Sequence, residues 1–290
     1  MNFVCKVASV NVNSSNSTLN KSLLKEFIVN PNLDIIFLQE IIYDNLSYIP
    51  SHLPIVNLAE AGSGTAILVR KSFGCSQPLL DSNGRISSVM INNVNYVNVY
   101  AFSKGNKKKE RDELFLDNMA VHLNKAGAAF NVIGGDFNCI LNSADSAGAN
   151  KNFSTGLKKL VDLFKFKDIA VELNNSNFTF FRNESKSRLD RFYCSEEFIQ
   201  NVSDFATVPV AFSDHCAIIM KVKIKSTDFT PRGRGYWKIN NFLLRDQEIQ
   251  KKISRQYDIW KGRQPYWSDR GLWWHSIAKT KTTQFYKPES

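Results

Sequence analysis

The chain carries the stretch Phe-Asn-Val-Ile-Gly-Gly-Asp-Phe-Asn at residues 130–138. Its first four residues form a short, largely apolar run, which predicts a buried strand. Asp136 follows this run after two glycines, and Asn138 lies two residues further on. A single carboxylate at a strand end is usually a turn former or a helix cap. The other strand ends therefore decide whether Asp136 has a chemical role.

Short apolar runs recur along the chain and predict further strands, several of them covered on both faces. They lie at residues 4–12, 34–38, 65–69, 86–91, 96–101, 189–193 and 217–224. Apolar residues recur at helical spacing at residues 19–28, at residues 114–123 and after Ser154, a suitable N-cap. Residues 104–111 are polar and predict a solvated loop. Mixed strands and helices predict a layered α/β or α+β domain.

Polar residues stand at the ends of several predicted strands, as Asp136 does. Glu40 directly follows one run, Asp190 lies within another, and Asp214 precedes a third beside His215. The full set is Asn11, Glu40, Tyr100, Asp136, Asn138, Asp190, Asp214 and His215. Carboxylates that share one rim repel one another unless a cation or protons offset them. Oxygen ligands without Cys or clustered His favour Mg²⁺ or Mn²⁺ over zinc, and His215 can exchange a proton near neutral pH.

The net positive charge is confined to the end of the chain. Residues 1–220 hold 21 Lys and Arg against 21 Asp and Glu, whereas residues 221–290 hold 16 against 6 and all five tryptophans. A Pro- and Gly-containing stretch at residues 226–235 marks a boundary. We therefore expect a folded domain at residues 1–225 and a basic, Trp-rich segment at residues 226–290. A basic tail with aromatic residues favours a nucleic-acid partner over a membrane.

The cysteines and the apolar stretches restrict the cellular setting. Five widely spaced cysteines without a Cys-x-x-Cys pair favour reduced, buried thiols and an intracellular protein. No apolar stretch approaches the ~20 residues that span a bilayer, and the N-terminus lacks the features of a signal peptide. We therefore expect a protein that neither crosses nor binds a membrane.

After the boundary at residues 226–235, apolar residues predict one helix around residues 243–253.

In order and spacing, the strand-end residues resemble the motifs of the endonuclease/exonuclease/phosphatase superfamily, which includes apurinic endonucleases, DNase I and inositol phosphatases. The motifs are Asn11, Leu38-Gln39-Glu40, Tyr100, Gly135-Asp136-Phe137-Asn138, Leu189-Asp190 and Ser213-Asp214-His215. The resemblance implies a DNase I-like, four-layered sandwich in which helices flank two packed mixed β-sheets.

Within the superfamily, the chain is most similar to the apurinic-like endonuclease domain of LINE-type non-LTR retrotransposons. The similar segments are residues 98–101, 134–139, 178–181, 187–191 and 212–216, followed by Gly233-Arg234-Gly235-Tyr236-Trp237 and Trp273-Trp274. The similarity implies that residues 226–290 are a linker to a reverse transcriptase domain, in a longer polyprotein or a truncated copy of one. Phe102 stands where such sequences carry Pro, and we expect this change to alter a loop without removing chemistry.

The resemblance also implies a reaction. It is the Mg²⁺-dependent nicking of double-stranded DNA, with Mn²⁺ as the alternative metal, and it leaves a 3′-hydroxyl that primes reverse transcription in the nucleus. Glu40 would be the main metal ligand, and Asn11 and Asp214 would hold or tune the metal. Asp136 would activate the attacking water, and Asn138 would orient it.

Further residues receive supporting roles from the same resemblance. His215, held by Asp190, would stabilise charge on the attacked phosphate together with Tyr100. Thr179 and Ser213 would support either the bound substrate or the residues that contact it. These roles suit phosphoryl transfer, which depends mainly on positioning and charge stabilisation.

Residues 182–188 form a polar segment that, in the resembling enzymes, is a hairpin touching the DNA groove. Here it is either such a hairpin, with Arg182 and Arg188 sensing groove shape, or a solvated turn. The tail either binds nucleic acid such as the element RNA or packs against the reverse transcriptase domain. Two rival functions stay open at this point: a cellular phosphodiesterase of the same superfamily, such as an apurinic repair nuclease or a phosphatase, and a catalytically inert nucleic-acid-binding fragment.

Overall fold

The computed structural model describes residues 2–14, 16–43, 46–60, 62–76, 78–103, 107–124, 128–148, 152–225 and 247–262. The chain divides into two units, Met1–Gly233 and Arg234–Ser290. The described part of the second unit is helix α6 (Gln247–Gly262), which overlaps the helix expected around residues 243–253. The Trp-containing segments at residues 233–237 and 273–274, which carried part of the retrotransposon resemblance, lie outside the described residues.

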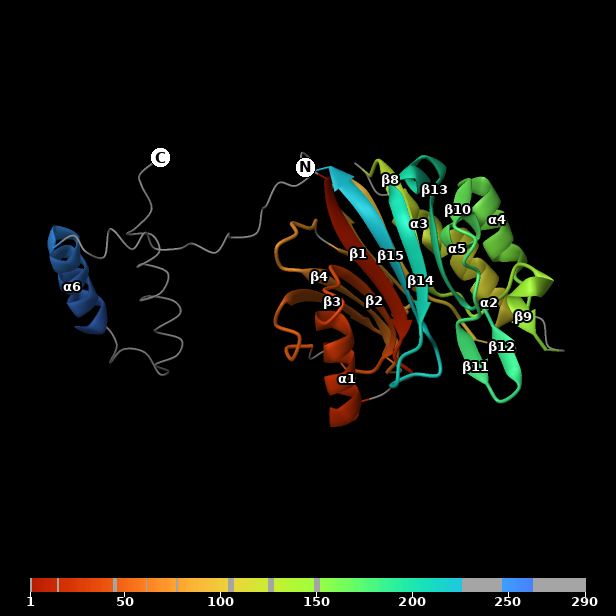
Figure 1. Cartoon of the computed structure of the whole chain (residues 1–290), viewed down its shortest axis with the longest axis horizontal. Helices are drawn as coiled ribbons and strands as arrows, with labels where there is room; N and C mark the ends of the chain where they lie inside the picture. The colour runs from red at the N-terminus through yellow and green to blue at the C-terminus, as the bar shows by residue number, and fades with distance from the viewer. Residues whose placement is uncertain are drawn as a thin grey trace. The chain divides into compact units, whose positions relative to one another are not determined.

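The first sheet of the larger unit has the strand order β14-β15-β1-β2-β4-β3. Its strands are β1 (Asn2–Asn11), β2 (Ile35–Ile41), β3 (His52–Leu58), β4 (Gly64–Arg70), β14 (Val202–Val208) and β15 (Ala217–Lys225). β1 and β2 run parallel, and the other neighbours in the sheet are antiparallel. The carboxyl ends of β1 and β2 therefore lie at the same edge (Figure 1).

The second sheet repeats this arrangement, in the order β10-β13-β8-β7-β6-β5. Its strands are β5 (Leu79–Leu80), β6 (Ile86–Ile91), β7 (Val94–Tyr100), β8 (Phe130–Asp136), β10 (Phe166–Asp168) and β13 (Asp190–Ser195). β7 and β8 are its parallel pair. A small third sheet contains β11 (Phe180–Arg182), β12 (Ser185–Ser187) and β9 (Ser146–Ala147).

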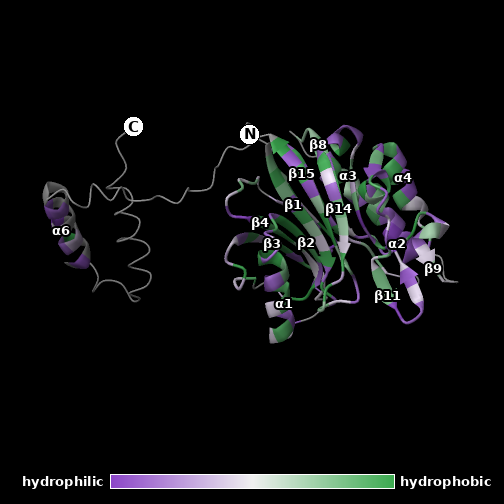
Figure 2. Cartoon of the chain, viewed as in Figure 1, coloured by the Kyte–Doolittle hydropathy of each residue, from purple (hydrophilic) through white to green (hydrophobic). Residues whose placement is uncertain are grey.

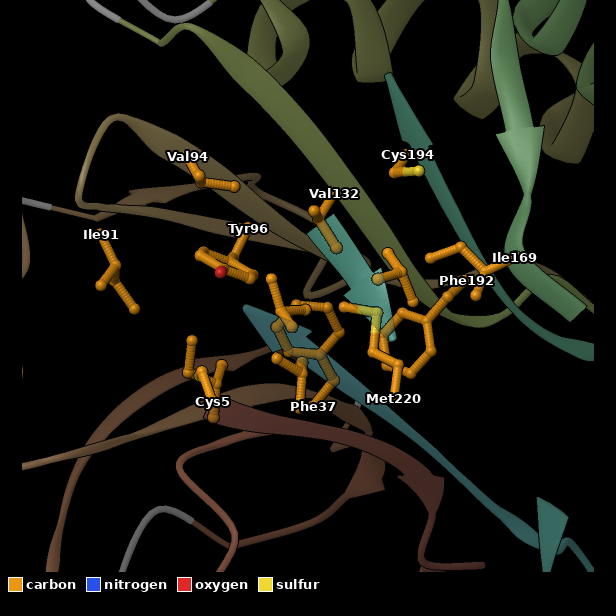
Figure 3. Packing of buried hydrophobic residues seen from close by; sticks show 14 of the residues in the cluster. Cys5, Phe37, Ile91, Val94, Tyr96, Val132, Ile169, Phe192, Cys194 and Met220 are labelled. Atoms are coloured by element: carbon orange, nitrogen blue, oxygen red, sulfur yellow. The ribbon is translucent and has the colours of Figure 1, made fainter. Parts of the chain in front are cut away.

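The two large sheets pack face to face through side chains that alternate along each strand. Phe37 of β2 points into this interface and meets Phe192 of β13, with the ring centroids 5.9 Å apart. Tyr96, Val132 and Met220 fill the same layer (Figure 3). Alternation along a strand sends every second residue to the opposite face. These residues are also largely apolar, so each sheet has an apolar outer face, formed for example by Leu38 in the first sheet and Val97 in the second. Figure 2 shows the resulting concentration of hydrophobic residues along the strands.

Helices cover both outer faces. α1 (Thr18–Val29) packs Leu24 and Ile28 against the first sheet, and Ser17 caps its amino end. The second sheet is covered by α2 (Lys108–Glu113), the π-helical η1 (Leu114–Asn118), α3 (Met119–Leu123) and α4 (Thr155–Leu163). The remaining helical segments are η2 (Ser143–Asp145), α5 (Ile169–Glu172) and η3 (Glu196–Asn201). The order helix, sheet, sheet, helix confirms the expected four-layered sandwich.

Two parts of the sequence prediction needed correction. Strands β3 and β14 were not predicted, because Pro54 in one and Ser203 and Asp204 in the other interrupt the apolar pattern of these edge strands. Residues 104–111 were expected to be a solvated loop, but α2 begins at Lys108 and Arg111 is fully buried.

In the described parts of the chain, no helix combines the length and hydropathy needed to cross a membrane.

Candidate active site

The strand-end polar residues meet where the carboxyl ends of the two parallel pairs face each other. Asn11 ends β1, Tyr100 ends β7 and Asp136 ends β8, while Asp190 begins the antiparallel neighbour β13. Asp136 lies opposite Tyr100 on one side and opposite Asp190 on the other. The topology therefore gathers residues that are far apart in the sequence.

Buried amides align the two sheets just inside this edge. Asn98 of β7 donates to the carbonyl oxygens of Leu38 and Ala66 in the other sheet, both at 2.9 Å. Gln39 Nε2 donates to Asn98 Oδ1 at 2.7 Å and to Ser9 Oγ at 3.0 Å. Buried polar groups that are bonded in this way fix one relative position of the layers.

Glu40 reaches the site because β2 is irregular at that position. The pairing of β2 with β4 shifts between Gln39 and Ile41, and Glu40 has a φ of 57°. A non-glycine residue in this left-handed region is uncommon and often marks a functional position. Glu40 Oε1 accepts hydrogen bonds from Asn11 Nδ2 and from the Tyr100 hydroxyl, both at 3.0 Å.

Asp136 is held by two asparagines. Asn11 Nδ2 donates to Asp136 Oδ2 at 3.0 Å, so this one amide bridges Glu40 and Asp136. The Asn138 backbone and side chain donate to the two oxygens of Asp136 at 2.9 and 3.1 Å. Gly135 precedes Asp136 with a φ of 143°, and a Cβ there would collide with the backbone of Val99. The Gly-Asp-x-Asn order is thus required to orient the carboxylate.

His215 forms a second buried pair with Asp190. Its Nδ1 donates to Asp190 Oδ2 at 2.8 Å, and its Nε2 lies 4.0 Å from Asp136 Oδ2. Thr179 is buried and accepts hydrogen bonds from the backbone of Leu189 and Asp190, both at 3.0 Å. Thr179 therefore supports Asp190 from within the protein.

The loop that carries His215 is also fixed. Ser213 Oγ accepts from the His215 backbone at 3.0 Å, and the Phe180 ring lies 4.8 Å from the imidazole. Asp214 is exposed beside them. The structure thus brings Ser213 and Asp214 next to His215, with Ser213 in a supporting position.

Electrostatic coupling changes the proton affinities of the buried groups. Burial raises the pKa of Asp136 to about 7, with Asp190 adding to the rise and His215 opposing it. Burial acts to lower the pKa of His215, but the carboxylates of Asp190 and Asp136 raise it to about 10. Burial, followed by Glu40, raises the pKa of the Tyr100 hydroxyl to about 12. At neutral pH the site therefore contains a protonated imidazole and a phenol that can donate.

Two neighbouring sets of atoms could hold a divalent cation. Asp136, Asp190 and His215 offer ligand atoms within 4.8 Å of one another, and Asp190 Oδ1 has no hydrogen-bond donor among the described residues. In this set, however, His215 is engaged by Asp190 and is cationic, which disfavours a second positive charge. Glu40 is only partly buried and offers carboxylate oxygens suited to Mg²⁺, whereas Asn11 turns its amide nitrogen toward Glu40 and its Oδ1 accepts from the Asn13 backbone at 2.8 Å. The chemistry of these groups fits a magnesium or manganese ion on the Glu40 side.

The two arginines of the polar segment are placed differently. Residues 180–187 form the hairpin β11–β12, with Asn183 in the left-handed region at its turn, and Arg182 is exposed on it. Arg188 is 3% exposed and binds Asp145 and Asp168, both at 2.8 Å. A guanidinium buried between two carboxylates does not reach a DNA groove, so the expected DNA contact of Arg188 is corrected to an internal role.

Residues that the sequence did not indicate support the segment after Asp136. Arg111 donates to the Asn138 carbonyl oxygen at 3.1 Å, and Arg191 donates to the Cys139 carbonyl oxygen at 2.8 Å. Both arginines are fully buried. Asp145 binds Arg191 and accepts from the backbone of residues 141 and 142. No sequence pattern distinguishes such arginines from solvated ones.

The fold and the acidic, histidine-containing edge define a class of protein. Residues 8–215 match the endonuclease/exonuclease/phosphatase family, and the chain belongs to it. In particular, the chain is 27% identical over 189 residues to the Transposon TX1 uncharacterized 149 kDa protein of Xenopus laevis. That match covers 62% of this chain and 14% of the relative, so the chain spans a small part of the relative's length.

Solved structures show the same fold at low sequence identity. The AP endonuclease LMAP from Leishmania major has a TM-score of 0.65 and 18% identity, covering 77% of this chain and 88% of that one. An AP endonuclease from Archaeoglobus fulgidus has a TM-score of 0.62 and 17% identity, covering 74% and 98%. The predicted fold and the family resemblance are both confirmed.

Proposed function

We propose that this chain is a divalent-metal-dependent DNA endonuclease that nicks target DNA and leaves a 3′-hydroxyl for target-primed reverse transcription. The observation that carries the proposal is the single amide of Asn11 that joins Glu40 to Asp136. Asp136 Oδ2 in turn lies 4.0 Å from Nε2 of His215, which is paired with Asp190. This set combines oxygen ligands, a proton acceptor and a cation, which phosphodiester hydrolysis requires.

Each residue has a defined part in the proposed mechanism. Asp136, held by Asn138, orients the attacking water and accepts its proton. His215 Nε2 donates to a non-bridging oxygen of the phosphate, and Asp190 keeps the imidazole charged and oriented. Glu40 would hold Mg²⁺ or Mn²⁺, Asn11 would position Glu40 through their hydrogen bond, and the exposed carboxylate of Asp214 would tune the local charge. A bound divalent cation supplies charge stabilisation at the phosphate and the leaving oxygen.

The context of the proposed reaction is a non-LTR retrotransposon polyprotein. The similarity to a transposon protein supports this context. In it, residues 226–290 are a basic linker that precedes a reverse transcriptase domain, and cleavage takes place on double-stranded DNA in the nucleus. Arg182, exposed on the hairpin, is the remaining candidate for sensing groove shape. The element RNA is the proposed partner of the basic tail.

The test is the relaxation of supercoiled plasmid by the purified chain in Mg²⁺. We expect nicked circles that disappear with EDTA and in the Asp136→Ala variant. The Asp204→Asn variant removes a surface carboxylate paired with Lys221 and serves as the matched control, which should nick normally. Nicking by Asp136→Ala at the rate of the control would refute the assigned mechanism.

A parallel comparison of substrates separates the rival functions. Abasic duplex, poly(A) and inositol phosphates are offered at equal concentration beside undamaged plasmid. The likeness of the fold to AP endonucleases makes the abasic duplex the most informative of these. Hydrolysis confined to one alternative substrate would identify a cellular phosphodiesterase, whereas DNA binding without any hydrolysis would identify an inert binding fragment.

A further inference from the structure

The side chain of Arg85 is held against two aromatic rings at the rim of the site. Its guanidinium carbon lies 4.4 Å from the centroid of the Tyr100 ring and 4.5 Å from that of Phe102. A guanidinium stacked on aromatic faces is oriented before any ligand arrives. Phe102 is the residue that replaces the Pro of resembling sequences, so its ring supplies a contact that Pro cannot.

The N–H groups of this guanidinium are available. Among the described residues, no carboxylate or carbonyl oxygen accepts a hydrogen bond from the Arg85 side chain, although its backbone is bonded to Asp81 and to Tyr100. Arg85 is half-buried, so its donors are directed by the protein and still open to solvent. This contrasts with Arg111, Arg188 and Arg191, each of which donates from its guanidinium to an oxygen of the protein.

The position of Arg85 relative to the chemistry is fixed by Tyr100. The Tyr100 hydroxyl donates to Glu40, while the face of the same ring contacts Arg85. Lys107 adds a second positive charge, with its Nζ 5.3 Å from the Phe102 centroid. A fork of free donors and a nearby ammonium form a cationic rim beside an acidic centre. The planar guanidinium suits an oxyanion that accepts two parallel hydrogen bonds, such as a phosphate.

We propose that Arg85, clamped by Tyr100 and Phe102, binds the phosphate of a DNA backbone position flanking the phosphodiester that is cut. The inference rests on the proposed DNA substrate. Arg85 fixes the register of the strand, so that one flanking phosphate must be bound for the neighbouring phosphate to lie beside His215. Phosphate contacts of this kind position a nucleic acid without reading its bases.

The experiment is a scan of binding with the full chain. Fluorescence anisotropy in EDTA measures the Kd of end-labelled duplexes in which one phosphate at a time is replaced by neutral methylphosphonate. With the wild-type chain, one flanking position should weaken binding about tenfold. We call this rise in Kd on methylphosphonate substitution the penalty of that position. In Arg85→Gln the position should lose its penalty, and the slope of log Kd against log salt concentration should fall by about 1.

Variants distinguish the clamp from general charge. The control is Lys109, which is exposed and pairs with Glu113 within α2. Lys109→Gln removes one positive charge and should keep the wild-type pattern of penalties. Arg85→Lys keeps the positive charge but loses the planar guanidinium, and Phe102→Leu keeps apolar bulk but loses the ring that contacts Arg85. Each variant should lose about half of the penalty in log Kd. A pattern in Arg85→Gln identical to that of the wild type would overturn the inference, as would a pattern lost equally in Lys109→Gln.

The outcome is separable from that of the proposed function. Nicking of plasmid by a chain whose Arg85→Gln variant keeps every penalty would leave the endonuclease standing and remove the phosphate site. Loss of the penalty in a chain that binds DNA without nicking it would support the phosphate site and reject the proposed activity. Failure of the wild-type chain to bind any duplex would overturn the phosphate site directly.

Discussion

The Asn11 side chain joins the two sheets at the site: its Nδ2 donates to Asp136 Oδ2 at 3.0 Å across 125 positions of the chain. The same nitrogen donates to Glu40 Oε1, also at 3.0 Å. A neutral amide between two carboxylates lowers their mutual repulsion and fixes their separation. The site is therefore assembled only when both sheets are in place.

Replacing Asn11 with Ala should lower the nicking rate by about 10²–10³, because it removes the amide donor shared by the two carboxylates and leaves them unbridged. Single-turnover nicking at saturating Mg²⁺ measures the effect. Asn30→Ala, at the exposed end of α1, removes an amide that donates to Glu26 instead of to a site residue, and it should change little. Equal rates for the two variants would contradict the bridging role.

Replacing Asp190 with Asn should change the pH dependence of nicking. The Asp190 carboxylate raises the pKa of His215, so removing its charge lowers that pKa and the imidazole loses its proton at lower pH. The alkaline limb of the rate profile should therefore move toward neutral pH, in addition to a lower maximum. An alkaline limb at the same pH in both proteins would show that His215 is not the acid that this limb reports.

His52 should make the fold sensitive to mild acid. It is buried, its ring nitrogens contact Ser51 Oγ and the Leu33 carbonyl oxygen, and burial lowers its pKa to about 4. The folded-state pKa lies below the ordinary value of 6.5, so the neutral imidazole contributes to the free energy of unfolding. This contribution is fully present above about pH 6.5 and is lost as the pH falls toward 4. The loss is on the order of 3 kcal/mol.

Urea unfolding of the wild-type chain and of His52→Gln, from about pH 7.5 to about pH 4, provides the measurement, because this range spans the ordinary and the lowered pKa of His52. His52→Gln has a different free energy of unfolding at neutral pH, so the comparison is between the slopes of that free energy against pH. A smaller decline in His52→Gln is expected. Parallel curves would assign the acid sensitivity to other groups.

Gly135→Ala should abolish the active site and cost about 3 kcal/mol or more of folding stability. The added Cβ would meet the Val99 backbone and would also require an unfavourable φ. Gly62→Ala is the matched control, because Gly62 has a φ of 107° and open space around its Cβ position. The difference between the two unfolding free energies isolates the collision, and a difference near zero would show that β8 adapts.

Arg188 and Arg182 should behave oppositely. Arg188→Met leaves Arg191 as the one buried cation paired with Asp145 and Asp168 among the described residues, and it should cost about 3–5 kcal/mol of stability. Arg182→Met, on the exposed hairpin, should leave stability unchanged and weaken DNA binding only. Thermal unfolding and anisotropy together distinguish them. A stable Arg188→Met protein with weakened DNA binding would restore the groove contact that the structure argues against.

From the sequence alone, the apolar runs indicated mixed strands and helices, and the family resemblance implied the four-layered sandwich and most members of the candidate site. Apolar alternation and strand length are local properties, so the predicted runs correspond to β1, β2, β4, β6, β7, β8, β13 and β15. The order of motifs from Asn11 to His215 identified the family, because each motif is a short segment whose meaning does not require knowledge of its neighbours in space. Edge strands β3 and β14 escaped because polar residues and Pro54 obscure the alternation.

Only the tertiary structure decided how these residues act on one another. The bulge that turns Glu40 toward Asn11, the burial of Arg188 and Arg111, and the stacking of Arg85 on Phe102 all depend on contacts between distant segments. An arginine has the same letter whether it is solvated, buried between carboxylates or clamped by rings. The free energy that separates these states comes from desolvation and from partners that the fold supplies, and a linear sequence does not record which partners those are.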